Sequence, residues 1–188
     1  MTTVTQVLDK NRIDALKQGL GGVIAGYTRD PGSAEAEFHA ATRVVRGFET
    51  ESTSRDFTVT IDEPKELGGT NKGPNPVEVL LGSLGTCQQI VLVAYAAVLG
   101  IELDELRIDV NGTLDLRGLF NVADVPSGFK QIHFDTHLRA RNTTPEQLAQ
   151  LKSLALAHCP VLDTLQRPIP VTNHYEMESL PAPRAATA

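Results

Sequence analysis

Tryptophan is absent from this 188-residue chain, and cysteine and methionine occur only twice each. Two cysteines, Cys87 and Cys159, are too few for the disulfide framework that holds small secreted domains together. The chain also has no Cys-x-x-Cys pair, no phosphate-binding glycine loop and no Gly-x-Ser-x-Gly elbow. The sequence therefore lacks the short motifs of several common enzyme classes, and its chemistry has to be sought elsewhere.

An excess of positive charge is also missing. The net charge is −6 and the pI is about 5.3, which argues against a nucleic-acid partner or an anionic membrane surface. Every apolar run of spanning length contains polar residues or turn signals. The N-terminus has no basic region followed by an apolar run, as a signal peptide would. We therefore expect a cytoplasmic protein with no nucleic-acid or membrane partner.

The chain divides by composition into three parts. Residues 8–26 carry apolar residues at helical spacing, weakened by three glycines, and a turn at Asp30–Ser33 follows. We interpret residues 1–33 as an N-terminal helical extension that packs on the main body or on a partner subunit. Residues 34–178 form the main domain, and the Ala- and Pro-rich residues 179–188 are expected to be a disordered tail.

Within the main domain the apolar pattern alternates between period two and helical spacing. Strands are predicted at 35–46, 57–61, 106–116, 130–141 and 169–177, with a strand end or a turn at Arg46-Gly-Phe. A helix capped by Thr144 or Thr143 runs to Cys159, and Pro160 breaks it before a short continuation over 161–165. This order predicts an α+β fold with a mostly antiparallel sheet covered by two helices.

The longest predicted helix, residues 76–99, is apolar on nearly every side. Asn75 stands at its N-cap, Pro76 at its first position and Glu78 three residues after the cap, which is the pattern of a capping box. Gly100 follows the last apolar turn and can close the helix in a left-handed conformation. The wide apolar coverage predicts a buried central helix with Cys87 near its middle.

The two cysteines are the first candidates for chemistry. Backbone N–H groups that open the helix after Pro160 would lower the pKa of Cys159. Cys87 lies about three turns into its helix, beyond the reach of the helix dipole, so only a cationic neighbour would lower its pKa. Spacing alone does not decide which of the preceding arginines would reach it, Arg43, Arg46 or Arg55. Composition alone favours inert, buried thiols.

Other chemistries have weaker support. His133, Asp135 and His137 share one strand face and are conceivable metal ligands, although a solvated polar face is the favoured interpretation. A cysteine hydrolase would pair Cys87 or Cys159 with a distant histidine, and no feature of the sequence singles out such a pair.

Three segments together carry a family resemblance: Glu63-Pro-Lys-Glu-Leu-Gly-Gly69, Asn75-Pro-Val-Glu78 with Cys87 on the same helix, and Ala157-His-Cys-Pro-Val161. In this order and spacing the chain resembles the OsmC/Ohr family of thiol-dependent organic hydroperoxide reductases, over about residues 35–177. The resemblance implies an OsmC-like fold, in which a curved, mostly antiparallel sheet packs on two helices. It also implies an intertwined homodimer with active sites at the subunit interface.

For the function, the resemblance implies a peroxidase of oxidative stress defence. Matched by position, Cys87 is the peroxidatic thiol and becomes a sulfenic acid, and Cys159 is the resolving thiol that condenses with it to a disulfide. An external dithiol then reduces the disulfide, and in the Ohr branch this reductant is a lipoylated protein. Apolar surroundings suit an alkyl or lipid hydroperoxide, and no cofactor or metal is expected.

The family also uses an arginine that holds the thiolate and a glutamate that pairs with it. Arg46 is the best match for the arginine, with Arg43 and Arg55 as alternatives. At the glutamate position this chain has Val77, and the acid falls one residue later, at Glu78, a rotation of about 100° on a helix. Glu78 is thus a candidate site residue whose safer role is the capping box. A non-catalytic protein of this fold that binds a hydrophobic small molecule at the dimer cleft is the rival hypothesis.

Overall fold

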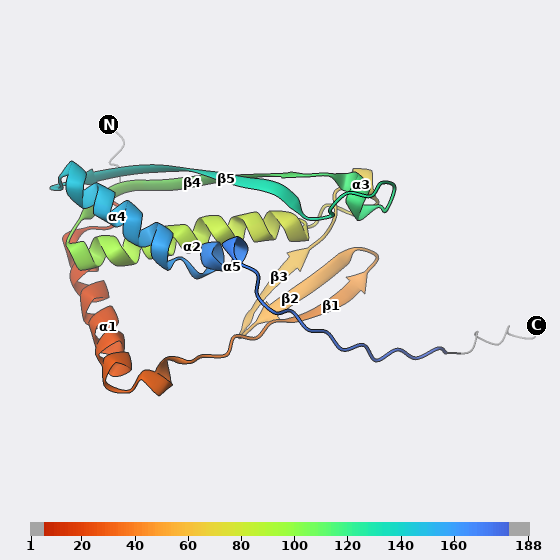
Figure 1. Ribbon diagram of the computed structural model, residues 1–188, viewed down its shortest axis with the longest axis horizontal. Coiled ribbons are helices and arrows are strands. Elements are labelled where there is room, and N and C mark those ends of the chain that lie inside the picture. Colours follow the sequence, from red (N-terminus) through yellow and green to blue (C-terminus); the bar gives the residue numbers. More distant parts are fainter. Residues whose placement is uncertain (1–5, 181–188) are drawn as a thin grey trace, which may run out of the picture.

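The computed structural model describes residues 6–180 (Figure 1). Its helices are α1 (Lys10–Arg29), α2 (Pro76–Leu99), α3 (Leu116–Leu119), α4 (Pro145–His158) and α5 (Pro160–Gln166), with short 3-10 turns η1 (Pro31–Ala34) and η2 (Lys65–Leu67). The strands are β1 (Ala41–Arg46), β2 (Glu49–Ser54), β3 (Phe57–Ile61), β4 (Glu102–Leu114) and β5 (Phe129–Arg141). Of the expected disordered tail, residues 181–188 lie outside the described residues.

The predicted ends of α2 are confirmed. The Asn75 side chain accepts a hydrogen bond from the Glu78 N–H (3.0 Å), and the Glu78 carboxylate accepts one from the Asn75 N–H (2.8 Å). Gly100 closes the helix with φ 73°. By length and composition α2 could also cross a membrane, a test that core helices pass as well. Here α2 lies along β4 and contacts α1, α4 and α5.

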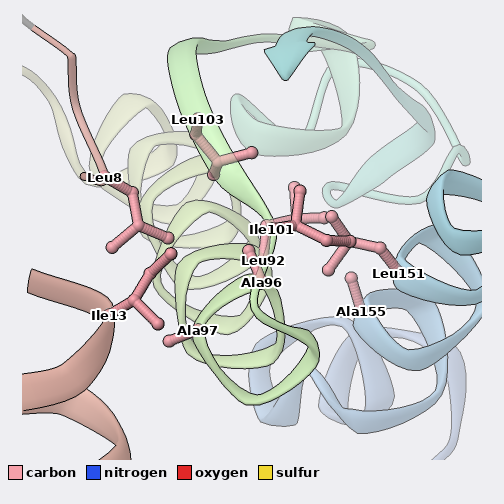
Figure 2. Packing of buried hydrophobic residues seen from close by; sticks show 9 residues of the cluster. All are labelled: Leu8, Ile13, Leu92, Ala96, Ala97, Ile101, Leu103, Leu151 and Ala155. Atoms are coloured by element: carbon pink, nitrogen blue, oxygen red, sulfur yellow. The ribbon is translucent and has the colours of Figure 1, made fainter. Parts of the chain in front are cut away.

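The main hydrophobic core forms where α2 meets the elements around its second half. The buried side chains point toward one another from α1, α2, β4, α4 and the residues that flank them (Figure 2): Leu8, Ile13, Leu92, Ala96, Ala97, Ile101, Leu103, Leu151 and Ala155. Within the single chain the burial of α2 is one-sided, because Ile90 and Val98 are 69% and 48% exposed. A second, smaller cluster surrounds Cys87 and Cys159.

The strands form two separate antiparallel sheets rather than one. β4 and β5 pair along their whole length, and β1, β2 and β3 form a meander on the other side of α2 (Figure 1). The Arg46-Gly-Phe turn is confirmed, with Gly47 at φ 59°. Strand β2 was not predicted, because its sequence Glu-Thr-Glu-Ser-Thr-Ser has no apolar residue. It is held instead by backbone pairing on both of its edges.

The predicted N-terminal helix is confirmed as α1, and it packs on the main body. The Leu8 N–H and C=O each form a 3.0 Å hydrogen bond with the backbone of Leu103, which ties the start of the helix to β4. Ile13 is then buried against the core, while Val23, Ile24 and Tyr27 in the second half are about half exposed. The helix therefore packs on the main body through its first half only.

The strand expected over 169–177 is not formed, and this prediction is wrong for the single chain. After α5 the described chain is extended, without secondary structure and exposed throughout. A strand needs a hydrogen-bonding neighbour, and β4 is the one strand that pairs with β5 among the described residues. Among the described residues, the alternating segment with Ile169, Val171, Tyr175 and Met177 therefore pairs with no strand, although β5 keeps one edge unpaired.

Candidate functional site

The two cysteines meet in the smaller hydrophobic cluster. Cys87 comes from the middle of α2 and Cys159 from the junction of α4 and α5, yet their Sγ atoms are 3.2 Å apart across 72 residues of sequence. Cys159 is completely buried, and Cys87 is half-buried. Apolar side chains surround them both: Leu84, Val91, Val110, Ile132, Phe134, Val161 and Leu162. Both thiols are free, so the pair is poised to form a bond with only a small movement.

The helix break places Cys159. It ends α4 and caps α5 at once, with an extended backbone (φ −84°, ψ 112°), and Pro160 takes the first position of α5. Its C=O accepts a hydrogen bond from the Asp163 N–H (2.9 Å), and its Sγ accepts one from the Leu162 N–H (3.5 Å). The predicted opening of a second helix at Pro160 is therefore confirmed, with the thiol at its N-terminus.

The surroundings of Cys87 oppose ionisation. Burial raises the pKa of the Cys87 thiol, and the neighbouring Cys159 raises it further, while a hydrogen bond from the Val161 N–H acts in the opposite direction. Sequence reasoning missed the Val161 N–H, although a proline at the first helical position indicates that the next N–H groups are unpaired. Within residues 6–180 no cation of the chain itself lowers the pKa of Cys87.

The three candidate arginines all lie on or beside the meander and have different environments. Arg43 forms an ion pair with Glu51 (2.6 Å), and the Arg55 guanidinium lies 5.1 Å from the centre of the Phe57 ring. Arg46 ends β1 at an irregularity in the pairing of β1 with β2, and it is exposed. In the described part of the chain Arg46 has no ion pair, and none of the three arginines bonds to Cys87.

Glu78 is fully engaged at the start of α2, where it completes the capping box. Nine residues separate it from Cys87, which on a helix is a rotation of half a turn and a rise of about 13 Å. Glu78 therefore faces away from the Cys87 of its own chain. Val77, at the position of the family acid, is 38% exposed beside an apolar cavity.

The loop that delivers the chain into α2 is organised by Asp62, which sequence reasoning missed. This buried carboxylate accepts hydrogen bonds from the N–H groups of Glu63 and Lys72 and from both the N–H and the hydroxyl of Thr70. The Thr70 hydroxyl is the main cause that lowers the pKa of Asp62 to about 2. The fold of this loop requires a close approach at Gly69, where an added Cβ would lie 1.9 Å from the Glu63 C=O oxygen.

The histidines considered as metal ligands lie on the outer face of β5. His133 Nε2 is 3.2 Å from Asp135 Oδ1, and His137 Nε2 is 3.8 Å from Asp109 Oδ2, all with exposed side chains. The described residues contain no group of three or more His, Cys, Asp or Glu side chains that could hold a metal ion. This face is therefore an exposed network of ion pairs.

An apolar cavity of about 560 Å³ borders the thiol cluster. It lies between the first half of α2, the first half of β5, and α5, and it shares four side chains with the cluster: Leu84, Ile132, Phe134 and Leu162. The arrangement thus places two adjacent thiols next to a space that suits an apolar molecule.

Comparison with known proteins agrees with this fold. The family model described as OsmC-like protein matches residues 69–174, more than half of the chain. The uncharacterized protein YmaD of Bacillus subtilis (strain 168) is 35% identical over 68 residues, which are 36% of this chain and 45% of YmaD. The match therefore spans less than half the length of that curated relative.

Solved structures of similar fold come from several bacteria. An OsmC-like protein from Mycoplasma pneumoniae superposes with a TM-score of 0.60 at 22% identity, covering 70% of this chain and 89% of that one. An organic hydroperoxide resistance protein OsmC from Legionella pneumophila gives a TM-score of 0.51 at 19% identity, covering 70% and 92%. These likenesses show the fold, and together with the family match they show that the chain belongs to the family of OsmC-like proteins.

Proposed function

We propose that this protein is a thiol-dependent peroxidase that reduces organic hydroperoxides to alcohols in oxidative stress defence. One observation carries the proposal: the only two thiols of the chain, 72 residues apart in sequence, lie 3.2 Å apart in the fold. The Legionella pneumophila relative described as an organic hydroperoxide resistance protein supports it at the level of the family.

The proposed reaction has three steps. The Cys87 thiolate attacks the distal oxygen of ROOH, so that an S–O bond forms, the O–O bond breaks, and the departing alkoxide takes a proton to give the alcohol. Cys159 then attacks the sulfur of the Cys87 sulfenic acid, a disulfide forms, and the hydroxyl leaves as water. An external dithiol returns two electrons by thiol–disulfide exchange. No cofactor takes part in this scheme.

The apolar surroundings favour an organic substrate over hydrogen peroxide. A peroxide with an alkyl chain gains by placing the chain in the cavity beside Leu84 and Phe134, whereas hydrogen peroxide has no such group. The half-buried state of Cys87 leaves room for a peroxide to approach, and the complete burial of Cys159 restricts its reaction to the neighbouring sulfur.

The raised pKa of Cys87 requires a cation for efficient catalysis, and we propose that Arg46 of a second copy supplies it in a homodimer. Arg46 is the candidate arginine with neither an ion pair nor a ring contact among the described residues, and its sheet leaves large apolar side chains exposed: Val44, Phe48, Phe57 and Val59. The unpaired edge of β5 and the extended residues 169–177 provide a further place for strand pairing between copies.

The external reductant belongs to the same proposal. A small dithiol on a flexible arm, such as that of a lipoylated protein, suits a half-buried disulfide beside an apolar cavity better than a bulky protein thiol. We propose a cytoplasmic location for this chemistry, because a reducing compartment keeps both thiols reduced between turnovers.

Two observations favour the rival function, a non-catalytic protein that binds a hydrophobic small molecule at the cleft between subunits. Burial raises the pKa of Cys87, and Val77 stands where the family has its acid. A protein of this kind would keep the cavity and leave the thiols unreactive.

Titration with cumene hydroperoxide separates the two functions. One equivalent is expected to remove both free thiols and to give a Cys87–Cys159 cross-link by peptide mass mapping, with one equivalent of cumyl alcohol released. Cys159→Ser should stop at a Cys87 sulfenic acid that dimedone traps, and Cys87→Ser should not react. Thiols that remain unchanged in the wild-type protein would exclude the peroxidase.

The arginine is tested by a matched pair of substitutions. Arg46→Ala should slow Cys87 oxidation by an order of magnitude or more, since a charge-assisted contact to the thiolate and peroxide is lost. Arg43→Ala removes a guanidinium from the same strand, where it is already paired with Glu51, and should leave the rate within about twofold. Equal effects of the two substitutions would remove Arg46 from the site.

A further inference from the structure

A ring contact links the two helices that carry the thiols. The Tyr95 ring of α2 and the His158 ring at the end of α4 have their centres 5.5 Å apart, at an interplanar angle of 37°. Tyr95 is half-buried and packs against the main core, so its position is fixed by its own helix. His158 is the residue directly before Cys159.

The position of Cys159 Sγ depends on the last turn of α4. The backbone at Cys159 is extended, so the cysteine is not held by a continuous helix through this point. On the α5 side, the Leu162 N–H and the buried Leu162 side chain fix the thiol. On the α4 side, Ala155 is buried one turn earlier, and the His158 ring contacts the Tyr95 ring of α2.

We propose that Tyr95 and His158 are positioning residues, which hold the last turn of α4 against α2 and thereby set the approach of Cys159 Sγ to Cys87 Sγ. Neither ring has to touch the peroxide or to transfer a proton. The role deepens the proposed function, because it concerns the step in which the two thiols join. It also applies to any oxidant that links them.

The expected effect follows from the free energy by which an aromatic contact stabilises a protein. Such pairs stabilise by an amount equivalent to roughly a two- to tenfold change in an equilibrium constant. Loss of the contact should therefore lower the effective concentration of one thiol at the other by roughly two- to tenfold. The first chemical step takes place at Cys87 on α2 and does not need Cys159 Sγ to approach, so its rate should change by less than about twofold.

The experiment measures a thiol–disulfide equilibrium with glutathione. On one side are the reduced protein and oxidised glutathione, and on the other are the Cys87–Cys159 disulfide and two molecules of reduced glutathione. His158→Ala and Tyr95→Leu should each shift it toward the reduced protein by the expected amount. The double variant should be no worse than either single variant, because both remove one contact. His158→Phe retains the ring and should restore the wild-type equilibrium.

His133→Ala is the matched control. It also removes an imidazole, from the outer face of β5 and away from the thiols, and should not shift the equilibrium. Thermal unfolding of the reduced variants checks that the fold is retained. Tyr95→Phe keeps the ring and should leave the equilibrium unchanged, and His158→Ala alone tests loss of the contact if Tyr95→Leu does not fold. A wild-type equilibrium in His158→Ala would overturn the proposal, as would additive effects in the double variant or no rescue by His158→Phe.

Failure of the proposed function has a different signature. If the protein does not react with cumene hydroperoxide, the glutathione equilibrium still reports on the contact between the rings. With an active peroxidase, His158→Ala should retain the rate of Cys87 sulfenic acid formation and prolong its lifetime by roughly two- to tenfold. A slower first step with an unchanged glutathione equilibrium would place His158 at the peroxide and contradict the positioning role.

Discussion

Oxidation of the thiol pair should strongly stabilise the folded protein. A Cys87–Cys159 bond would close a loop of 72 residues, because the two cysteines are that far apart in sequence. In the chain-entropy treatment a loop of this length reduces the entropy of the unfolded chain by about 15 cal/mol/K, which corresponds to about 4 kcal/mol at 25 °C. The two sulfur atoms have to approach by only about 1 Å, so the folded state should keep most of this gain.

Denaturation in guanidinium chloride measures the effect. With a slope of about 4 kcal/mol per M, the midpoint of the oxidised protein should lie about 1 M above that of the reduced protein. The slope itself should decrease on oxidation, because a cross-linked unfolded chain exposes less surface. Heating should give a midpoint higher by roughly 8–16 °C for a chain of this size.

Cys159→Ser is the control, because the same oxidant cannot form the bond in that variant. Protein concentration has to be held constant, since association of subunits stabilises by mass action. Superimposable curves for oxidised and reduced wild-type protein, with the bond verified by mass, would refute the reasoning. That result would mean that cross-linking strains the folded state by as much as it restricts the unfolded one.

Three further outcomes follow from the fold. The pKa of Asp62 is lowered from 3.8 to about 2, so the ionised carboxylate stabilises the fold fully above pH 4, and this stabilisation is lost as the pH falls toward 2. Urea denaturation at a series of pH values should show this loss in the wild-type protein. Asp62→Asn should be less stable at neutral pH and should not show the loss. Gly69→Ala should lower the free energy of unfolding, because no Cβ fits at this position. Gly21→Ala should raise the free energy of unfolding by about 0.5–1 kcal/mol, because no atom lies within 4 Å of the added Cβ. A more stable Gly69→Ala than Gly21→Ala variant would contradict the loop structure. Ile13→Ala should lower the free energy of unfolding by about 2–5 kcal/mol and expose α1 to proteolysis; an unchanged cleavage rate would mean that α1 is held by other contacts.

Local signals in the sequence predicted the helices well. Asn75, Pro76 and Glu78 define the start of α2 without reference to the rest of the chain, and Pro160 defines the junction of α4 and α5. The strands were less predictable, because pairing rather than composition decides them. Strand β2 has two neighbours and forms from polar residues, whereas residues 169–177 alternate well and form no strand in the single chain.

For the site, too, local features could be predicted from the sequence, whereas features that depend on packing between distant segments could not. The identity of its thiols followed from a family resemblance, but the approach of Cys87 to Cys159 depends on how α4 packs on α2, which spacing along the chain does not reveal. The Asp62 loop was missed because its ligands are mostly backbone N–H groups, which leave no residue pattern. The role of Arg46 stays a prediction, because it concerns a contact between subunits.

The meander β1–β3 has a consequence for the order of folding. Its three strands are neighbours in sequence, so its contacts are local and can form within microseconds to milliseconds. The α2 layer instead waits for β4, β5 and α4, which are synthesised later. At about 5–20 residues per second, several seconds separate the emergence of Cys87 from that of Cys159. A newly made chain therefore has Cys87 for several seconds before Cys159 is present to form a disulfide with it.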